Sequence, residues 1–144
     1  MNRFDSIQYM NVYSQKREFL YTDIEKEFRE FITICRGNGL KLSGRIFYSI
    51  EHISKEGRVV AEFFYPSAHL KKVRNTMLDF QTYFMIDSMI SIVVENNFEA
   101  NMEKAYAALL EIASAKGKQI ISPIYNEICA DGKSLYFIVK AAVG

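Results

Sequence analysis

The sequence has no tryptophan and only two prolines, two cysteines and two histidines in 144 residues. Cys35 and Cys129 cannot make a disulfide framework, and we expect a reducing, cytoplasmic setting. His52 and His69 are not placed to act with them as metal ligands or as a catalytic couple. The sequence therefore predicts no metal and no cofactor.

An excess of charge of one sign is also missing, because 18 basic and 17 acidic side chains leave a net charge of +1. Without an electrostatic attraction to phosphates or anionic lipid, we predict no nucleic-acid partner and no membrane partner. No apolar run approaches a membrane span, and the first residues lack the pattern of a signal peptide. Phosphate-binding loops, dinucleotide fingerprints and Gly-x-Ser-x-Gly motifs are absent, so the chain is predicted not to be an enzyme.

What the sequence does contain is an internal repeat, marked by Gly39 and Gly117, which are 78 residues apart. The same shift maps apolar helix positions onto apolar or small ones, and it pairs Ile46 with Ile124, Lys55 with Lys133 and Val60 with Ile138. We predict one domain over 1–144, with a first repeat at about 5–66, a connector at about 67–82 and a second repeat at about 83–144. Two copies in one domain create a seam, where ligand clefts form.

Each repeat reads as a strand, a helix and a β-hairpin. The first has a strand at 7–14, a helix from a capping box at Thr22–Glu25 to Gly37–Gly39, and strands at 42–53 and 58–65. The second has a strand at 85–94 that we expect to be buried on both faces, a helix capped by Asn97 or Asn101, and strands at 120–129 and 134–143 joined at Asp131-Gly132. The connector has weak helical character over 68–80.

These elements predict an α+β fold of two β-α-β-β repeats related by a pseudo-two-fold axis. Six to eight strands would form an antiparallel sheet with both helices on one face. The other face would be left as an open cleft.

Alternation along the strands assigns side chains to faces. Val59, Ala61 and Phe63 would lie under a helix, and Glu62 and Phe64 would point the other way. The 78-residue shift pairs Glu62 with Lys140, which would form either part of a ligand site or a surface charge pair. Tyr125 with Glu127 offers an aromatic wall and a carboxylate, which suits a cation. The predicted ligand-binding residues are Glu127, Tyr125, Glu62, Phe64, Tyr136, Lys140 and Phe47.

Three segments carry a resemblance to a known family: Gly39–Tyr48, Glu62–Pro66 and Ser122–Glu127. They resemble a helix-exit glycine before an aromatic strand, an acid-to-proline strand ending, and a strand with tyrosine and acid in the gyrase-inhibitor-like (GyrI-like) small-molecule-binding fold. The resemblance implies a tandem of two units with a ligand cleft. The chain is also similar to an uncharacterised Firmicutes branch of this fold found near genes for LXG-type secreted toxins.

We therefore interpret the chain as a non-catalytic protein that binds a small organic ligand, with a cation favoured, as a monomer or homodimer. The alternative is a protein-interaction factor, chaperone-like or adaptor-like, which the resemblance would link to a secreted-toxin system. A weaker alternative, implied by relatives of this fold, is a hydrolase using Glu62 or Glu127 as a cleft acid.

Overall fold

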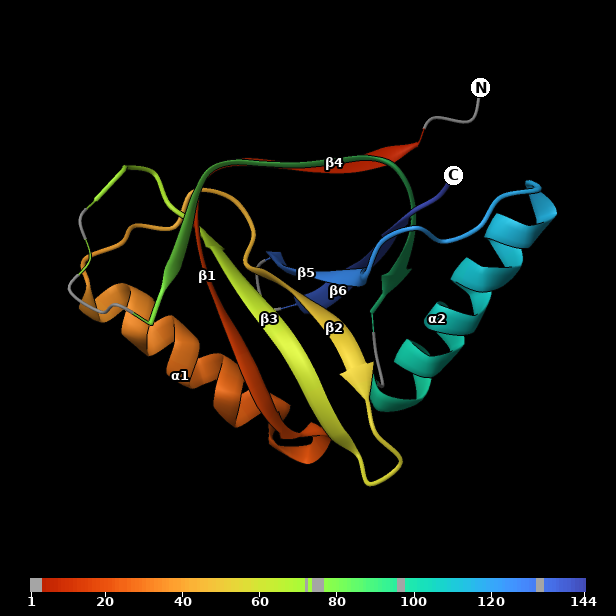
Figure 1. Ribbon diagram of the computed structural model, residues 1–144, viewed down its shortest axis with the longest axis horizontal. Coiled ribbons are helices and arrows are strands. Elements are labelled where there is room, and N and C mark those ends of the chain that lie inside the picture. Colours follow the sequence, from red (N-terminus) through yellow and green to blue (C-terminus); the bar gives the residue numbers. More distant parts are fainter. Residues whose placement is uncertain (1–3, 72, 74–76, 96–97, 132–133) are drawn as a thin grey trace. The chain divides into compact units, whose positions relative to one another are not determined.

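A computed structural model describes residues 4–71, 73, 77–95, 98–131 and 134–144 (Figure 1). Over these residues the chain has the predicted α+β fold, with six strands in antiparallel pairs and two α-helices. The contacts divide it into two units, which we call the N-terminal unit (residues 8–84) and the C-terminal unit (residues 4–7 with 85–144). No helix in the described part of the chain is long and apolar enough to cross a membrane.

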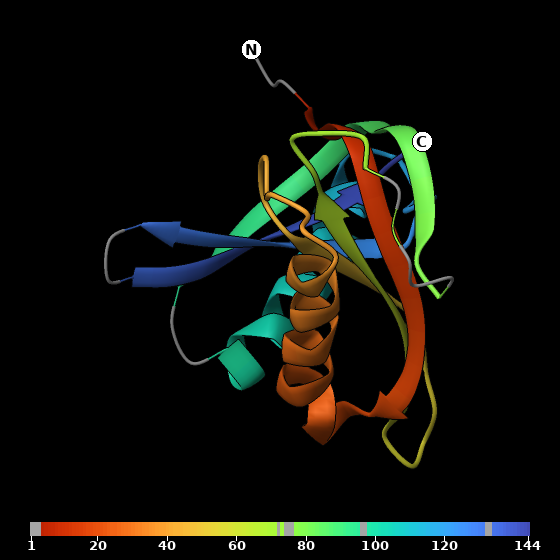
Figure 2. The same ribbon diagram turned by 90° about the vertical axis from the view of Figure 1, so that its left-hand side faces the viewer.

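The N-terminal unit is a three-stranded sheet with one helix on it. Its elements are β1 (Asp5–Leu20) from residue 8 onward, the 3-10 turn η1 (Tyr21–Asp23), α1 (Ile24–Gly37), β2 (Phe47–Ile53), β3 (Arg58–Pro66) and the first residues of β4 (Asp79–Val94). β3 is central and pairs with both β1 and β2. The rings of Phe28 and Phe31 on α1 lie 5.7 and 5.6 Å from that of Phe63 on β3, so α1 covers the predicted face (Figure 2).

The C-terminal unit repeats this plan. Its elements are β4 from residue 85 onward, α2 (Phe98–Ala115), β5 (Ile124–Asp131), β6 (Ser134–Ala142) and residues 4–7. β6 is central and pairs with β4 and β5. Met102 and Leu109 of α2 share one buried apolar cluster with Val139 and Ala141 of β6. Both repeats are therefore β-α-β-β, as predicted, with a helix on one face.

The two helices end in the same way, 78 residues apart. The N–H of Gly39 donates to the carbonyl of Arg36 at 2.9 Å and that of Leu40 to Cys35 at 3.2 Å. Around Gly117, the corresponding bonds run from Gly117 to Ser114 at 3.0 Å and from Lys118 to Ala113 at 2.9 Å. Both glycines have a left-handed φ, +78° and +66°. Each helix thus ends in a Schellman motif, which favours glycine at this position.

The first strands of the two repeats also share a backbone device. Asn11 and Ser88 have φ values of +54° and +56°, which few residues other than glycine adopt. The carbonyl of Asn11 accepts from the N–H of Ser67 at 2.9 Å, and that of Ser88 accepts from Val143 at 3.0 Å. In each unit the residue after the last strand is therefore tied to the same point of the first strand.

The shift between repeats is not constant, because the first hairpin is two residues longer. It is 78 at the helix exits but 76 at the end, where Ser67 corresponds to Val143. The match of Val60 with Ile138 and the equivalence of Glu62 with Lys140 are therefore wrong. An even difference still leaves each residue on its predicted face.

The strand registers show the correct equivalence. Phe47 lies opposite Phe64 in the N-terminal unit, and Tyr125 lies opposite Lys140 in the C-terminal unit. Phe64 therefore corresponds to Lys140. Two residues back along each strand, Glu62 corresponds to Ile138.

Several element boundaries differ from the predictions. β1 runs to Leu20 instead of residue 14, and β4 begins at Asp79, which replaces the end of the predicted helical connector. β2 and β5 begin later than predicted, because Leu42 and Ile120 form only isolated bridges to Ser67 and Val143.

The predicted capping box and the doubly buried strand are also wrong. Thr22 lies inside η1, and the N-cap residue Asp23 makes no side-chain capping bond. Met85 and Val93 on β4 are 47% and 53% exposed. Asn101 lies within α2. Three positions that the predictions used, Asn97, Gly132 and Lys133, lie outside the described residues.

Candidate functional site

The predicted ligand-binding residues are divided between the two units and point away from the helices. Because Phe63 and Val139 contact the helical side, their strand neighbours face the opposite way. Phe47, Phe64, Tyr125, Glu127 and Lys140 are each less than a tenth exposed, and Glu62 and Tyr136 are half-buried. The five buried residues therefore do not line a surface open to solvent, and four of them contact each other in pairs within their own unit, Phe47 with Phe64 and Glu127 with Lys140.

In the N-terminal unit this face carries a cluster of aromatic rings. Phe47 and Phe64 stack with centroids 4.6 Å apart and planes 7° from parallel. Phe84 contacts both rings, at 5.2 and 5.1 Å, and Tyr9 stacks on Phe47 at 5.7 Å. The sequence predicted Phe47 and Phe64 but missed two other rings. Phe84 was assigned to the second repeat, and Tyr9 lies on the predicted first strand but was not picked as a site residue.

Glu62 lies next to this cluster on β3, one same-face position from Phe64. It pairs in register with Lys16 on β1 and Ser49 on β2. Burial raises the pKa of its carboxyl, Glu51 and Asp79 raise it further, and Lys16 and the Ser14 hydroxyl lower it; the net pKa is raised. Lys16 also pairs with Glu51 at 3.5 Å. Three carboxyls and one ammonium make this a locally acidic position.

In the C-terminal unit the corresponding face holds a buried ion pair. The Nζ of Lys140 donates to Oε1 of Glu127 at 2.8 Å, and both side chains are at most 5% exposed. The same Nζ donates to the carbonyl of Ser6 at 2.9 Å and lies 3.3 Å from Oδ2 of Asp5. Glu127 was predicted as a carboxylate for a cationic ligand; the cation that it binds here is Lys140.

Sequence reasoning missed the contribution of Asp5 and Ser6 to this ion pair. Alternation placed Glu127 and Lys140 on one face. In the observed register Glu127 lies opposite Ile138, which makes Lys140 its diagonal neighbour. No local pattern points from residues 5–6 to residue 140. Tyr136, the remaining predicted residue, lies opposite Cys129 toward the hairpin end.

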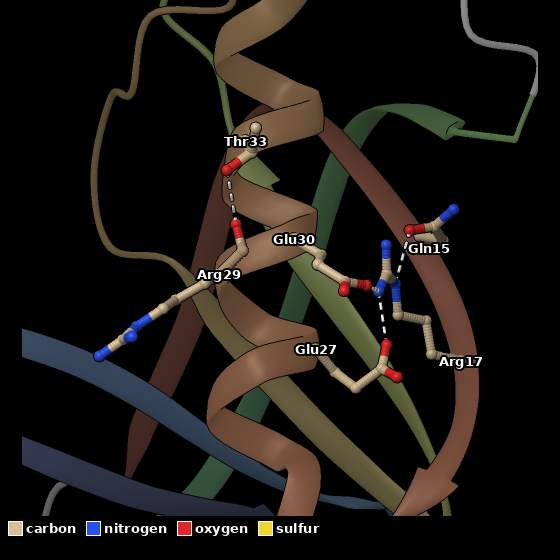
Figure 3. A network of polar contacts seen from close by, with 6 residues as sticks. All are labelled: Gln15, Arg17, Glu27, Arg29, Glu30 and Thr33. Carbon is tan, nitrogen blue, oxygen red and sulfur yellow. Dashed lines mark hydrogen bonds and ion pairs between the residues drawn. The ribbon is translucent and has the colours of Figure 1, made fainter.

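A separate hollow of about 920 Å³ lies along α1 in the N-terminal unit, away from the predicted residues. Arg17 on β1 borders it and donates to Glu27 at 2.5 Å, to Glu30 at 2.9 Å and to Gln15 at 2.8 Å (Figure 3). Thr33 donates to the carbonyl of Arg29 within the helix. The charged side chains at this hollow already pair with one another. We therefore interpret them as a structural network that links α1 to β1.

The described residues contain no cluster of three or more His, Cys, Asp or Glu suited to a metal. Both cysteines are buried, and burial raises the pKa of the Cys35 thiol to about 12. Cys35 is therefore an inert core residue, as the helical pattern predicted.

Two repeat units, each with one helix on an antiparallel sheet, define the chain as a protein of the GyrI-like fold class, in agreement with the resemblance of its motifs. More particularly, the chain belongs to the family described as "Domain of unknown function (DUF5085)", which matches residues 8–144. No curated protein sequence matches it.

Solved structures similar to the chain include the C-terminal domain of EcmrR, with 14% identity, a TM-score of 0.75 and 98% of each chain covered. The EcmrR–DNA complex also matches, with 14% identity and a TM-score of 0.74; 97% of this chain is covered, and it spans 57% of the EcmrR chain. A hydrolase from Listeria innocua has 8% identity and a TM-score of 0.60 over 99% of this chain and 92% of its own. Identities this low establish the fold alone. The absence of a nucleic-acid partner and the link to secreted toxins stay predictions.

Proposed function

We propose that the chain binds a small organic cation without catalysis, and that Glu62 supplies the carboxylate. A binding role is supported by the resemblance of the chain's motifs to the GyrI-like small-molecule-binding fold, and the fold itself matches the full length of the EcmrR C-terminal domain. The observation that carries the choice of ligand is the acidic position around Glu62, next to stacked aromatic rings. The carboxylate attracts the charge of an organic cation, and the rings beside it, which are buried and stacked on one another, provide apolar surroundings for it and not an open aromatic face.

The electrostatics of Glu62 explain why a cation would bind there. Partial burial and two neighbouring carboxyls make its ionised form costly, and Lys16 offsets this only in part because it also pairs with Glu51. A bound cation would relieve that cost. Binding would therefore strengthen as pH rises through the raised pKa of Glu62.

A comparison of the two candidate carboxylates, Glu127 and Glu62, also favours Glu62. Glu127 already has the ammonium of Lys140 at 2.8 Å and is 2% exposed, so a ligand would have to displace a buried internal partner. Glu62 is half-buried and closer to solvent. The proposal therefore assigns the cation to Glu62.

The test is calorimetric titration with benzyltrimethylammonium, with its uncharged isostere neopentylbenzene as the ligand control. Glu62→Gln should weaken binding by about 10- to 100-fold, the lower part of the range measured for close charge pairs, since this quaternary cation has no N–H to donate. Glu18→Gln is the matched control, because it removes an exposed carboxylate paired with Arg58 at 3.0 Å in the same unit. That control should bind like the wild type.

Three results would contradict the proposal in different ways. Equal affinity in the wild type and in Glu62→Gln would remove Glu62 from the site. No binding of any amphipathic cation by the wild type would remove the function. Hydrolysis of model esters that disappears in Glu62→Gln would replace binding by catalysis, with Glu62 as the acid.

A further inference from the structure

Residues 4–7 form a short arm that packs onto the C-terminal unit. The ring of Phe4 lies 5.5 and 5.4 Å from the Nζ atoms of Lys116 and Lys118, just after α2. Asp5 and Ser6 contact Lys140, and Ile7 is 1% exposed. The arm therefore adds a carboxylate and a carbonyl oxygen to the buried pair of Lys140 and Glu127.

The arm has a counterpart in the N-terminal unit. There the first residues of β4 lie against the equivalent face, where Phe84 contacts Phe47 and Phe64. Since Phe64 corresponds to Lys140, each arm contacts the same position of its unit. In the N-terminal unit the ring of Phe84 contacts two other rings. In the C-terminal unit the oxygen atoms of Asp5 and Ser6 contact the ammonium group of Lys140.

The carboxylate of Asp5 is the part of this arm that is most open to displacement. The side chain of Asp5 is 42% exposed although that of Lys140 is 5% exposed, and Phe4 is 41% exposed. The Asp5–Lys140 distance of 3.3 Å is longer than the 2.8 Å to Glu127. Glu127 and the carbonyl of Ser6 are thus both close to Lys140, at 2.8 and 2.9 Å, and the carboxylate of Asp5 is held more loosely.

We propose that Lys140, with Glu127 and Tyr125 beside it, forms a binding position for a small carboxylate-bearing molecule, which the arm occupies. The carboxylate of Asp5 stands for the ligand's carboxylate, so displacement leaves the charge around Lys140 unchanged. Tyr125 lies opposite Lys140 on β5 and offers a ring to the apolar part of the ligand. This position lies in the C-terminal unit and does not depend on cation binding at Glu62.

The test uses benzoate as the probe and the backbone amide spectrum of the full chain as the readout. Asp5→Ala should tighten benzoate binding on the order of tenfold, because the competing carboxylate is gone. The perturbed amides should include those of Tyr125 and Lys140. Glu25→Ala is the matched control, since it frees an exposed arginine, Arg29, elsewhere. That control should gain nothing.

A third variant separates binding at Lys140 from general attraction to charge. Asp5→Ala combined with Lys140→Met and Glu127→Gln removes the ammonium and its buried partner together, which keeps the fold intact more safely than Lys140→Met alone. It should lose the benzoate response. Unchanged affinity in Asp5→Ala, a response that persists in the triple variant, or perturbation confined to the surroundings of Lys116 and Lys118 would each overturn the proposal.

Discussion

The two units share a backbone plan and differ in the chemistry of one face. Helix exits, strand ties and central strands correspond position by position. Yet the residue opposite Phe47 is Phe64, and the residue opposite Tyr125 is Lys140. The two repeats therefore share the hydrogen bonds that close each unit. The strand face that points away from the helix carries rings in one unit and charges in the other.

The segment that covers each face has the same chemistry as the face, aromatic in one unit and polar in the other. Phe84 brings a third ring to the stacked pair in the N-terminal unit. Asp5 and Ser6 bring oxygen ligands to an ammonium in the C-terminal unit. Since an unpaired buried charge is costly and a buried ring is not, the ionic face needs its covering segment more.

The largest effect is expected when the ion pair of Lys140 and Glu127 is broken. Lys140→Met leaves Glu127 buried without its cation, and we expect a loss of about 3–5 kcal/mol in the free energy of unfolding. Adding Glu127→Gln should restore most of it, because neither charge then remains. Urea unfolding of the single and double variants measures both effects.

Its matched control is Lys16→Met in the N-terminal unit. Lys16 is 59% exposed on its side chain and pairs with Glu51 at 3.5 Å, so its removal should cost less than about 1 kcal/mol. If Lys140→Met lowers the free energy of unfolding no more than Lys16→Met does, the buried ion pair contributes no more to stability than an exposed one, and the contrast fails.

A smaller effect sharpens the comparison at the helix exits. Gly39→Ala and Gly117→Ala should each cost about 1–2 kcal/mol, because both residues have a left-handed φ. A Cβ at Gly39 would also lie 2.2 Å from Nζ of Lys71, whereas none of the described atoms lies within 4 Å of one at Gly117. Gly39→Ala should therefore cost slightly more, as thermal unfolding can measure.

Two further variants test the cause of that difference. In a Lys71→Ala background the two losses should become equal, since the flexible ammonium is gone. Gly37→Ala, at the last residue of α1 and in open space, should instead stabilise by roughly 0.4–1 kcal/mol, because it lowers the entropy of the unfolded chain. Equal losses in the parent chain would show that Lys71 moves aside without cost.

Much of the fold could be predicted from the sequence because it depends on local signals. Glycine at 39 and 117 marked the helix exits, and two-residue alternation assigned the faces of β3 and β6 correctly. The equivalence of Glu62 with Lys140 failed because a fixed shift ignores a two-residue difference in hairpin length. Even differences preserve faces but change partners.

The contents of the candidate site could be predicted only in part. Glu62, Phe47 and Phe64 were found from one strand pattern. Asp5 and Phe84 were not, since they reach their unit from residues far away in sequence, and no local periodicity reports such a contact. The pairing of Glu127 with Lys140 depends on the register of the β5–β6 hairpin, which alternation alone does not fix.

The smallest expected effect is a difference in pH dependence between two carboxyls, one from each unit. Burial raises the pKa of Asp5, but the N–H of Ser6, Lys140 and Ser91 outweigh it, so the net pKa is lowered. Its stabilisation is present above its ordinary value and is lost as pH falls through the lowered one. The pKa of Glu62 is raised, so its penalty is absent at low pH and develops as pH rises from its ordinary value through the raised one.

Neutral variants should therefore drift in opposite directions. Measured by urea unfolding between pH 3 and about pH 7, Asp5→Asn should become less stable relative to the wild type as pH rises, and Glu62→Gln should become more stable. Both side chains are partly exposed, so solvent screening keeps the drifts small. Drifts of the same sign would contradict the contrast, because they would mean that the carboxyl beside Lys140 and the carboxyl beside the aromatic rings experience the same kind of field.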